Sequence, residues 1–308
     1  MDITTLMMQM LKLFMIIFLG YIIYKCKLVD DNFTAKFSKL ILNVTMPAMI
    51  LASVLNLEER QPIRDVLTAF AVAMTLFFII LPIVGLILAK ILRVGKNREG
   101  LYIFMSSFSN VGFMGFPIIN ALCGGTGLFY AAIFNLAFNL SIFSLGVCLV
   151  NKDKGQKTKF DPKLLFTPGI ILSSMAIIIY FLNIKFPAII CETVDSIGSI
   201  TSPSAMIIIG CSLAKMDVKS IFSDWRLYPW TLIKQIAIPL LLWVPLNMII
   251  KNELLLTVSY ILSAMPVANT AVMFATVYDG DVELAARSVF LTTLLSLITV
   301  PLCIMTVM

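Results

Sequence analysis

The side chains of this chain that could hold a ligand are amides and hydroxyls set inside long apolar stretches. Asn110 lies in one such stretch, beside Ser109, and Asn135 and Asn139 lie in the next. Asn135 and Asn139 are one helical turn apart, so both amides face the same side of a helix. An amide buried in hydrocarbon without a partner costs about 4 kcal/mol or more. Each amide must therefore bind another helix or a polar ligand.

Asn269 and Thr270 form a second polar group late in the chain, shortly after Pro266. Asn269 and Asn110 both stand close to points where proline or glycine is expected to interrupt a helix, and for these two amides we predict contact with a ligand. For Asn135 and its neighbour one turn on, a hydrogen bond between helices, contributing about 1 kcal/mol, is an equally good interpretation.

Arg287 is a candidate for binding an anionic substrate, because a guanidinium can bind a carboxylate through two parallel hydrogen bonds. It also follows Glu283 by four residues, so a salt bridge within one helix explains it without a ligand. The salt bridge is the favoured interpretation. Contact of Arg287 with an anionic substrate is the alternative.

Four other ionisable residues lie inside the apolar stretches. Glu192 and Asp195 are weak candidates for coupling to H⁺ or Na⁺, because a carboxylate within a membrane can bind either ion. Both lie near the end of their stretch, where water can reach them. Lys12 and Lys234 are expected to extend along their helices until the ammonium reaches the lipid headgroups.

Metal and covalent chemistry are not expected. The chain has no histidine, and its six cysteines are scattered singly, so neither a zinc site nor a histidine-activated nucleophile is predicted. Asp279 and Asp281 resemble the acids of an intramembrane protease, but no second intramembrane aspartate faces them. We therefore expect no cofactor, no metal and no enzymatic activity.

The composition indicates the environment of these residues. Of 308 residues, 60% are hydrophobic and only 13% are charged, which leaves too little polar surface for a water-soluble protein of this size. The net charge of +6 comes from basic residues in short loops and not from an exposed basic stripe, so nucleic acid is not an expected partner. The chain is predicted to be an all-α protein of the lipid bilayer.

Ten apolar windows are each long enough to cross a cell membrane. They cover residues 4–24, 35–55, 65–91, 99–122, 127–150, 164–182, 189–214, 227–250, 254–278 and 282–307. Sixteen Lys and Arg residues lie in the loops on one face and four on the other, so both termini are predicted to lie outside the cell. The longest polar segment, 151–163, is then a cytoplasmic linker.

The fourth span is predicted to be broken. Residues 101–125 carry Gly112, Gly115 and Pro117, and proline removes a backbone donor while glycine weakens the helix around it. Main chain freed in this way is tolerated in a membrane only where protein or a cavity satisfies it. Paired broken spans at matching places in two halves of a chain indicate a substrate site near the bilayer midplane.

An internal repeat supplies the matching place. At an offset of 156, residues 45–49 align with a similar proline-containing segment at 201–206, and at one residue more Pro82 meets Pro239. A unit of five spans begins and ends on opposite sides, so its second copy must be inverted. The ninth span is then the equivalent of the fourth. At the common offset Asn110 aligns with Pro266, so the two breaks correspond in kind and not residue by residue.

The chain resembles the auxin efflux carrier family of secondary transporters, which includes the plant PIN proteins and bacterial malate and malonate permeases. The resemblance rests on TMPAM at 45–49, SNVGFMGFP at 109–117, SAMPVANTA at 263–271, and a hydrophilic loop between the fifth and sixth spans. It covers essentially the whole chain. The loop is short here, so regulation through it is not expected.

The resemblance implies a fold similar to those of bile acid sodium symporters and of the sodium/proton antiporter NhaA. Ten transmembrane helices would form two inverted five-helix repeats, residues 1–150 and 164–308, whose broken spans cross at Pro117 and Pro266. Spans one, two, six and seven would form a scaffold, and spans three to five and eight to ten a transport domain. The substrate would lie beside the crossing.

The predicted function is secondary active transport of a small organic anion, a malate-like or auxin-like carboxylate, by alternating access. The substrate-binding positions that we expect are Asn110, Pro117, Asn135, Asn139, Pro266, Asn269, Thr270 and Arg287. A sodium-coupled symporter of the bile acid type would give similar hydropathy, and a channel is a further alternative. The sequence leaves open which anion is carried, its direction, the choice between H⁺ and Na⁺, and whether a homodimer forms.

Overall fold

A computed structural model describes residues 3–57, 60–153, 168–215 and 224–305. In these residues all regular secondary structure is helical, and the one extended contact is an isolated antiparallel bridge between Ser109 and Val267. Seven helical segments are long and apolar enough to cross a membrane. The prediction of an all-α membrane protein is confirmed, and most of the linker 151–163 lies outside the described residues.

The first half of the chain contains the four earliest candidate spans, several of them interrupted by single π-helical turns. Its elements are α1 (Ile3–Lys25), α2 (Asp31–Leu40), η1 (Ile41–Thr45), α3 (Met46–Leu55), α4 (Ile63–Thr75), η2 (Leu76–Ile80), α5 (Leu81–Ile91), α6 (Glu99–Ser107), η3 (Val111–Gly115), α7 (Phe116–Ser141), η4 (Ile142–Gly146) and α8 (Val147–Lys152).

The second half contains the remaining spans, again with interruptions. Its elements are α9 (Pro168–Leu182), α10 (Ala188–Ser199), α11 (Thr201–Lys215), α13 (Leu227–Leu232), η6 (Ile233–Ala237), α14 (Ile238–Ile249), α15 (Glu253–Ser263), α16 (Thr270–Val277) and α17 (Val282–Met305). Among the described residues, predicted spans six and nine correspond to shorter apolar helices, and the second half of predicted span four is counted within the long segment 111–152.

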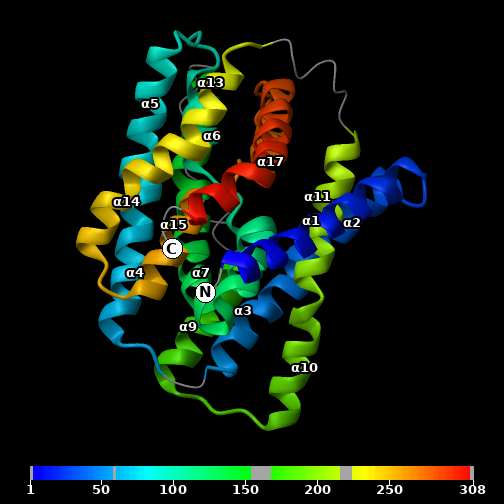
Figure 1. Ribbon diagram of the computed structural model, residues 1–308, viewed down its shortest axis with the longest axis vertical. Helices are drawn as coiled ribbons and strands as arrows, with labels where there is room; N and C mark the ends of the chain where they lie inside the picture. The colour runs from blue at the N-terminus through cyan, green and yellow to red at the C-terminus, as the bar shows by residue number, and fades with distance from the viewer. Residues whose placement is uncertain (1–2, 58–59, 154–167, 216–223, 306–308) are drawn as a thin grey trace.

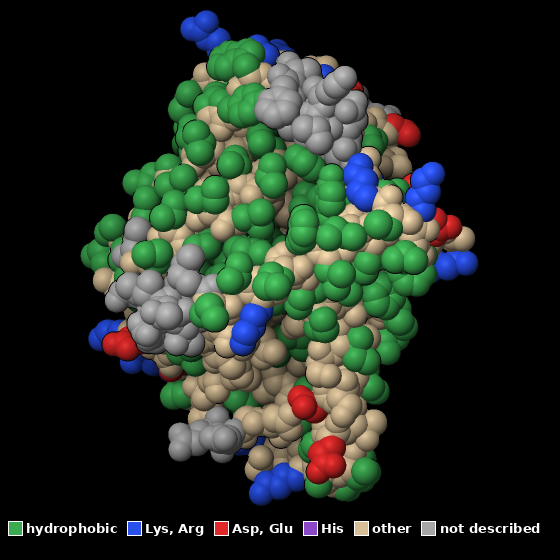
Figure 2. All heavy atoms as spheres, turned by 45° about the vertical axis from the view of Figure 1, so that its right-hand side comes forward, with side chains coloured by type: hydrophobic (Ala, Val, Ile, Leu, Met, Phe, Trp, Pro, Cys, Tyr) green, Lys and Arg blue, Asp and Glu red, His purple; other side chains and the backbone are tan. Residues whose placement is uncertain are grey.

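The outer surface is the apolar surface that a bilayer requires. Large hydrophobic side chains such as Met15, Leu241 and Met248 are 65%, 73% and 79% exposed. Figure 2 shows hydrophobic side chains over most of one face, with the few charged side chains mainly at its rim. In water such a surface would favour association. In lipid it needs no partner.

The 42-residue apolar segment 111–152 is too long for one straight helix across a membrane. A straight helix of that length would measure roughly 63 Å at 1.5 Å per residue, about twice the hydrocarbon thickness. The segment bends at Gly124, whose φ of 63° and ψ of −161° interrupt α7. A side chain is strained at such a φ, so glycine is the residue suited to this turn. The predicted boundary between spans four and five, at 122–127, contains this bend.

Several prolines of this fold lie just after a π turn. Four π turns, η1, η2, η3 and η6, each end two residues before a proline, at Pro47, Pro82, Pro117 and Pro239. Proline lacks an N–H and its ring clashes with the carbonyl of residue i−4. The wider i→i+5 turn moves that carbonyl out of register with the ring, so the helix continues through the proline.

The break in span four therefore does not lie at Pro117, as the sequence analysis expected. Helix α6 ends at Ser107, residues Phe108 to Asn110 are not helical, and helical structure resumes at Val111. Pro117 is the second residue of α7. The π turn η3 lets the helix continue through Pro117, and the break lies about two turns earlier.

The break in span nine lies where it was expected, between the end of α15 at Ser263 and the start of α16 at Thr270. The two breaks meet. The backbone N–H of Asn110 donates to the Pro266 carbonyl at 2.7 Å, and that of Ala268 donates to the Phe108 carbonyl at 3.0 Å. The two breaks thus meet at Ser109 and Val267, and Pro266 takes part in this contact, whereas Pro117 lies within α7 and does not.

Helices α7 and α15, which adjoin the two breaks, lie centrally in the molecule. In Figure 1, α1, α10 and α11 lie on one side of the molecule and α4, α5 and α14 on the other, with α7 and α15 between them. Helices α1 and α11 pack through glycine, because a Cβ added to Gly210 would lie 2.0 Å from the Ile17 carbonyl oxygen. Close approach of this kind is typical of helix pairs in membranes.

Candidate functional site

A cavity of about 260 Å³ lies against the crossing of the two broken spans. It is bounded by η1 and α3 on one side, and by the two breaks, α7 and η4 on the other. Its lining is mostly apolar and consists of Leu42, Asn43, Met46, Pro47, Ile50, Asn110, Val111, Gly112, Phe113, Asn135, Phe138, Asn139, Phe143, Ala268, Asn269, Thr270 and Met273. None of these described lining residues is charged. The polar groups of the cavity are amides and a hydroxyl.

Asn110 is the best-defined polar group of the cavity. It is 4% exposed and forms the N-cap of η3, because its Oδ1 accepts the backbone N–H of Phe113 at 3.1 Å. Its Nδ2 is buried and has no hydrogen-bond partner in the described part of the chain. A buried donor without a partner costs about 1–3 kcal/mol. The amide is therefore oriented by its oxygen, with a donor left for a ligand.

Thr270 supplies a second unused polar atom. Its Oγ1 is buried and unpartnered among the described residues, and it lies at the first position of α16. Asn269 is the N-cap residue of the same helix, but its side chain makes no capping hydrogen bond. The N-termini of η3 and α16 thus both begin at cavity-lining residues. Such ends carry partial positive charge and favour an anion.

Asn135 and Asn139 complete the set of amides. Asn135 is buried at 6% exposure, Asn139 is half-buried, and both line the cavity from α7. No hydrogen bond joins either side chain to another described residue. Of the eight positions predicted from the sequence, the structure brings five into one cavity: Asn110, Asn135, Asn139, Asn269 and Thr270.

The main chain of the crossing is satisfied by side chains that the sequence analysis did not assign to the site. The backbone N–H of Val267 donates to Thr292 Oγ1 at 3.1 Å, and Lys234 Nζ donates to the Met265 carbonyl at 3.1 Å and to Ser109 Oγ at 3.0 Å. Polar main chain at membrane depth requires such partners. Pro266 belongs to this crossing through its carbonyl, and it does not line the cavity.

Lys234 does not extend to the headgroups, so that prediction was wrong. The side chain is 2% exposed. Thr231, Lys234 and Gln235 share one face of its helix, and all three are buried. This polar face was visible in the sequence. The groups that it would meet, Ser109 and the main chain of the broken helix, were not.

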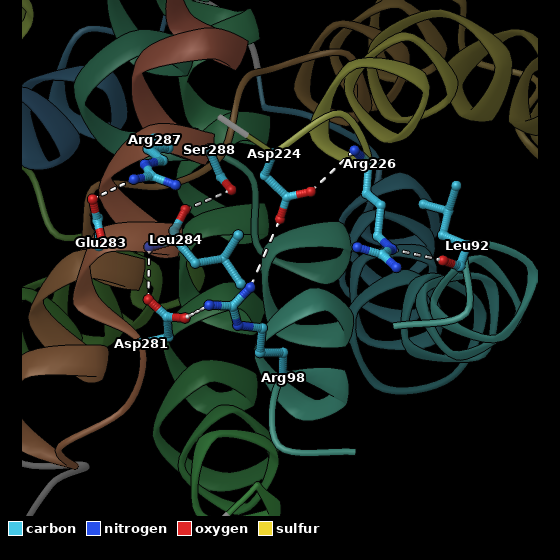
Figure 3. A network of polar contacts seen from close by, with 9 residues as sticks. All are labelled: Leu92, Arg98, Asp224, Arg226, Asp281, Glu283, Leu284, Arg287 and Ser288. Atoms are coloured by element: carbon cyan, nitrogen blue, oxygen red, sulfur yellow. Dashed lines mark hydrogen bonds and ion pairs between the residues drawn. The ribbon is translucent and has the colours of Figure 1, made fainter. Parts of the chain in front are cut away.

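Arg287 lies in another region, at the start of α17. It is bonded to Glu283 within that helix, and it does not line the cavity. Figure 3 shows it beside a network in which Arg98 at the start of α6 pairs with Asp281 at 2.8 Å and with Asp224 at 3.8 Å. The salt-bridge interpretation of Arg287 matches this placement.

The network also includes Arg226, whose Nε donates to the Leu92 carbonyl at 3.2 Å and whose backbone N–H donates to Asp224 at 3.1 Å. It therefore links the end of α5 and the start of α6 with the starts of α13 and α17. These four helices come from both halves of the chain and all lie in the predicted transport domain.

Glu192 and Asp195 lie apart from the candidate site. Both are exposed, and Asp195 accepts a hydrogen bond from Asn56 Nδ2 at 3.3 Å beside a separate cavity of about 250 Å³. Pro117 is likewise absent from the lining. The ion-coupling role of the two acids stays a prediction.

Comparison with known proteins matches the family described as membrane transport protein along residues 5–304, nearly the whole chain. The chain belongs to this family. It is the auxin efflux carrier family that the sequence resembles, so the protein is a multi-pass membrane transporter and not an enzyme.

Several known transporters are similar to this chain along nearly their whole length. An uncharacterized transporter of Methanocaldococcus jannaschii is 24% identical over 293 residues, covering 93% of this chain and 94% of the relative. A Rhizobium meliloti protein named "Putative malonate transporter" is 24% identical over 303 residues, covering 94% and 92%. The uncharacterized transporter YfdV of Escherichia coli K12 is 23% identical over 308 residues, covering 96% of each.

Proposed function

We propose that this member of the auxin efflux carrier family is a secondary transporter of small dicarboxylates of the malonate class. The observation that carries the proposal is the Asn110 amide, buried, fixed by its oxygen, and left with an unpartnered nitrogen at the wall of a cavity. A carboxylate oxygen could accept hydrogen bonds from this amide nitrogen and from the unpartnered Thr270 hydroxyl.

The charge of the site supports an anion without requiring a cationic side chain. The two helices that begin at the cavity, η3 and α16, each present roughly half a positive charge at their N-termini. Half-helix N-termini in broken spans bind anionic substrate groups in secondary transporters. The volume of about 260 Å³ suits a small ligand. The name of the Rhizobium meliloti relative supports malonate as the first substrate to test.

The architecture that we propose is ten spans in two inverted repeats of five. Support comes from the π turns, because η2 begins 157 residues before η6 and Pro82 lies 157 residues before Pro239. The same local irregularity thus recurs in spans three and eight at the offset found in the sequence. An antiparallel bridge between the two breaks is the contact that inversion requires.

Alternating access would move spans three to five and eight to ten against a scaffold of spans one, two, six and seven. The cavity supports this division, because η1 and α3 line it from the scaffold and all its other walls belong to the moving part. By the positive-inside rule both termini would lie outside the cell.

The test is uptake of radiolabelled malonate into proteoliposomes by the wild type and by Asn110→Leu. We expect the variant to insert and to lose at least about tenfold in uptake rate, because losing the donor and the anion-binding N-cap removes roughly 1.4 kcal/mol or more. Asn151→Leu is the matched control. Asn151 is also buried, but its Nδ2 already donates to the Val147 carbonyl at 2.9 Å, and it does not line the cavity.

Uptake by Asn110→Leu at the wild-type rate would remove Asn110 from the site. If the wild type itself ignores malonate, a thermal-shift screen against mono- and dicarboxylates identifies the class of substrate, since a ligand that binds the native state raises its apparent stability.

A further inference from the structure

A fully buried lysine side chain lies behind the candidate site. Lys234 lies in η6, is 2% exposed, and donates from Nζ to Ser109 Oγ and to the Met265 carbonyl. Ser109 belongs to the break of span four and Met265 to the break of span nine. One side chain thus joins both breaks. The ion pairs of the described residues do not include Lys234, so no carboxylate neutralises it there.

The helix ends around the crossing account for a cation at this place. Helix α6 ends at Ser107 and α15 ends at Ser263, so two half-helices direct their C-termini at the crossing. Each C-terminus carries roughly −0.5 of a charge. Together they match one ammonium, whereas the N-termini of η3 and α16 face the cavity with the opposite sign. The crossing therefore separates a cation site from an anion site.

In transporters with broken helices, unwound carbonyls and half-helix C-termini are the groups that coordinate a coupling Na⁺. Here such a carbonyl, that of Met265, together with a serine hydroxyl, binds the ammonium of Lys234 instead. We propose that Lys234 is a tethered cation that occupies the place of a coupling sodium ion, so that anion binding in this protein does not require Na⁺. This inference rests on the proposed function for its transport readout.

Lys234 acts through the crossing and does not line the cavity, so it is a positioning residue. Its two hydrogen bonds hold the two breaks together and keep η3 and α16 directed at the substrate. A sodium ion could do the same only if the lysine were absent. Removal of the side chain should therefore create a sodium dependence that the wild type lacks, which is a result that loss of packing alone does not produce.

The first experiment uses the wild type. Malonate uptake into proteoliposomes is measured in sodium chloride and in choline chloride at equal concentration. The expected result is the same rate in both salts. A rate that rises several-fold with sodium would overturn the proposal, because it would show that a coupling Na⁺ is still required.

The second experiment needs no substrate. Apparent Tm is measured for Lys234→Ala in the same two salts. We expect a lower Tm than that of the wild type in choline and a saturable rise on adding sodium, because truncation frees room for one ion beside the Met265 carbonyl. Lys234→Met fills that room without charge and should show no sodium effect. Lys12→Ala, which removes an exposed lysine of α1, should behave as the wild type in both salts.

The outcomes separate the two proposals. A wild type that does not transport malonate contradicts the proposed substrate, while the sodium response of Lys234→Ala still decides the role of the lysine. Equal Tm values for Lys234→Ala in both salts would overturn the tethered-cation proposal. If that variant cannot be purified, equilibrium binding of radiolabelled Na⁺ to the wild type decides the matter: none is expected, and one bound ion per chain contradicts the proposal.

Discussion

The backbone N–H of Asn110 donates to the carbonyl of Pro266 at 2.7 Å, which joins the break of one membrane span to the break of another 156 residues later. The reciprocal bond, from Ala268 to Phe108, makes the contact a single antiparallel bridge. Each break thus supplies the partner that the other lacks. Neither could exist alone in hydrocarbon, where an unpaired main-chain group costs several kcal/mol.

The crossing should be sensitive to the hydroxyl that accepts a main-chain N–H group. Thr292→Val removes the oxygen that accepts the N–H of Val267 and leaves that group buried without a partner. We expect a loss of about 1–3 kcal/mol, seen as a lower apparent Tm in detergent. Thr299→Val on the same helix is the control, because Thr299 Oγ1 is buried and unpartnered among the described residues. Its removal should be neutral or stabilising. Equal losses for both variants would contradict the role of Thr292.

Much of this site could be predicted from the sequence because its polar residues are rare in an apolar background. Asn110 and Asn269 stood out for that reason, and both line the cavity. The exact place of the break in span four could not be predicted. A proline in the sequence does not reveal whether the helix breaks there or widens into a π turn. Before Pro117 the helix widens into the π turn η3 and does not break.

The buried lysine illustrates a different limit. A lysine near an apolar helix end is usually extended to the headgroups. Whether Lys234 does so depends on which face of α13 and η6 meets the crossing, and that is a tertiary property. The position of Ser109 in another span decides it. The pairing of Asn110 with Pro266 at the repeat offset was visible in the sequence as an alignment, but its meaning as a hydrogen bond was not.

The packing of α1 on α11 gives a prediction on stability. In Gly210→Ala the new Cβ would lie 2.0 Å from the Ile17 carbonyl oxygen and 2.7 Å from the Tyr21 nitrogen, both backbone atoms that cannot turn aside. The helices must separate, and we expect a loss of about 1–3 kcal/mol. Gly125→Ala is the control, since nothing lies within 4 Å of its added Cβ. The measurement is apparent Tm, and equal values for the two variants would contradict this packing.

The environment of the Asp153 carboxyl leads us to expect that the stability of the protein depends on pH. Its carboxylate accepts the backbone N–H groups of Gly100 at 2.6 Å and Leu101 at 3.0 Å, at the start of α6. Burial raises the pKa of Asp153, and these two hydrogen bonds only partly oppose the shift. The folded state thus holds this proton more tightly than the unfolded state does. Its contribution to stability is full below the unfolded pKa, about 4, and is lost as pH rises through the folded pKa.

The measurement for Asp153 is the difference in apparent Tm between the wild type and Asp153→Asn, followed from about pH 3 to about pH 7. Taking the difference removes the titration of the other carboxylates. The advantage of the wild type should shrink as pH rises. A difference that grows with pH would mean that the hydrogen bonds to α6, and not burial, control this carboxyl.

Thr270 offers a test that separates substrate binding from stability. Its Oγ1 is buried in the cavity wall and unpartnered among the described residues, so Thr270→Val should leave the apparent Tm unchanged or higher without a ligand. If the hydroxyl binds a carboxylate, the same change weakens malonate binding by about tenfold, the loss of roughly one hydrogen bond.

Thr231→Val is the matched control. Thr231 Oγ1 is also buried and unpartnered among the described residues, but it lies in α13 and does not line the cavity. Thermal shift against malonate measures both effects in one titration. The same malonate affinity in both variants would place the substrate elsewhere than at the N-terminus of α16.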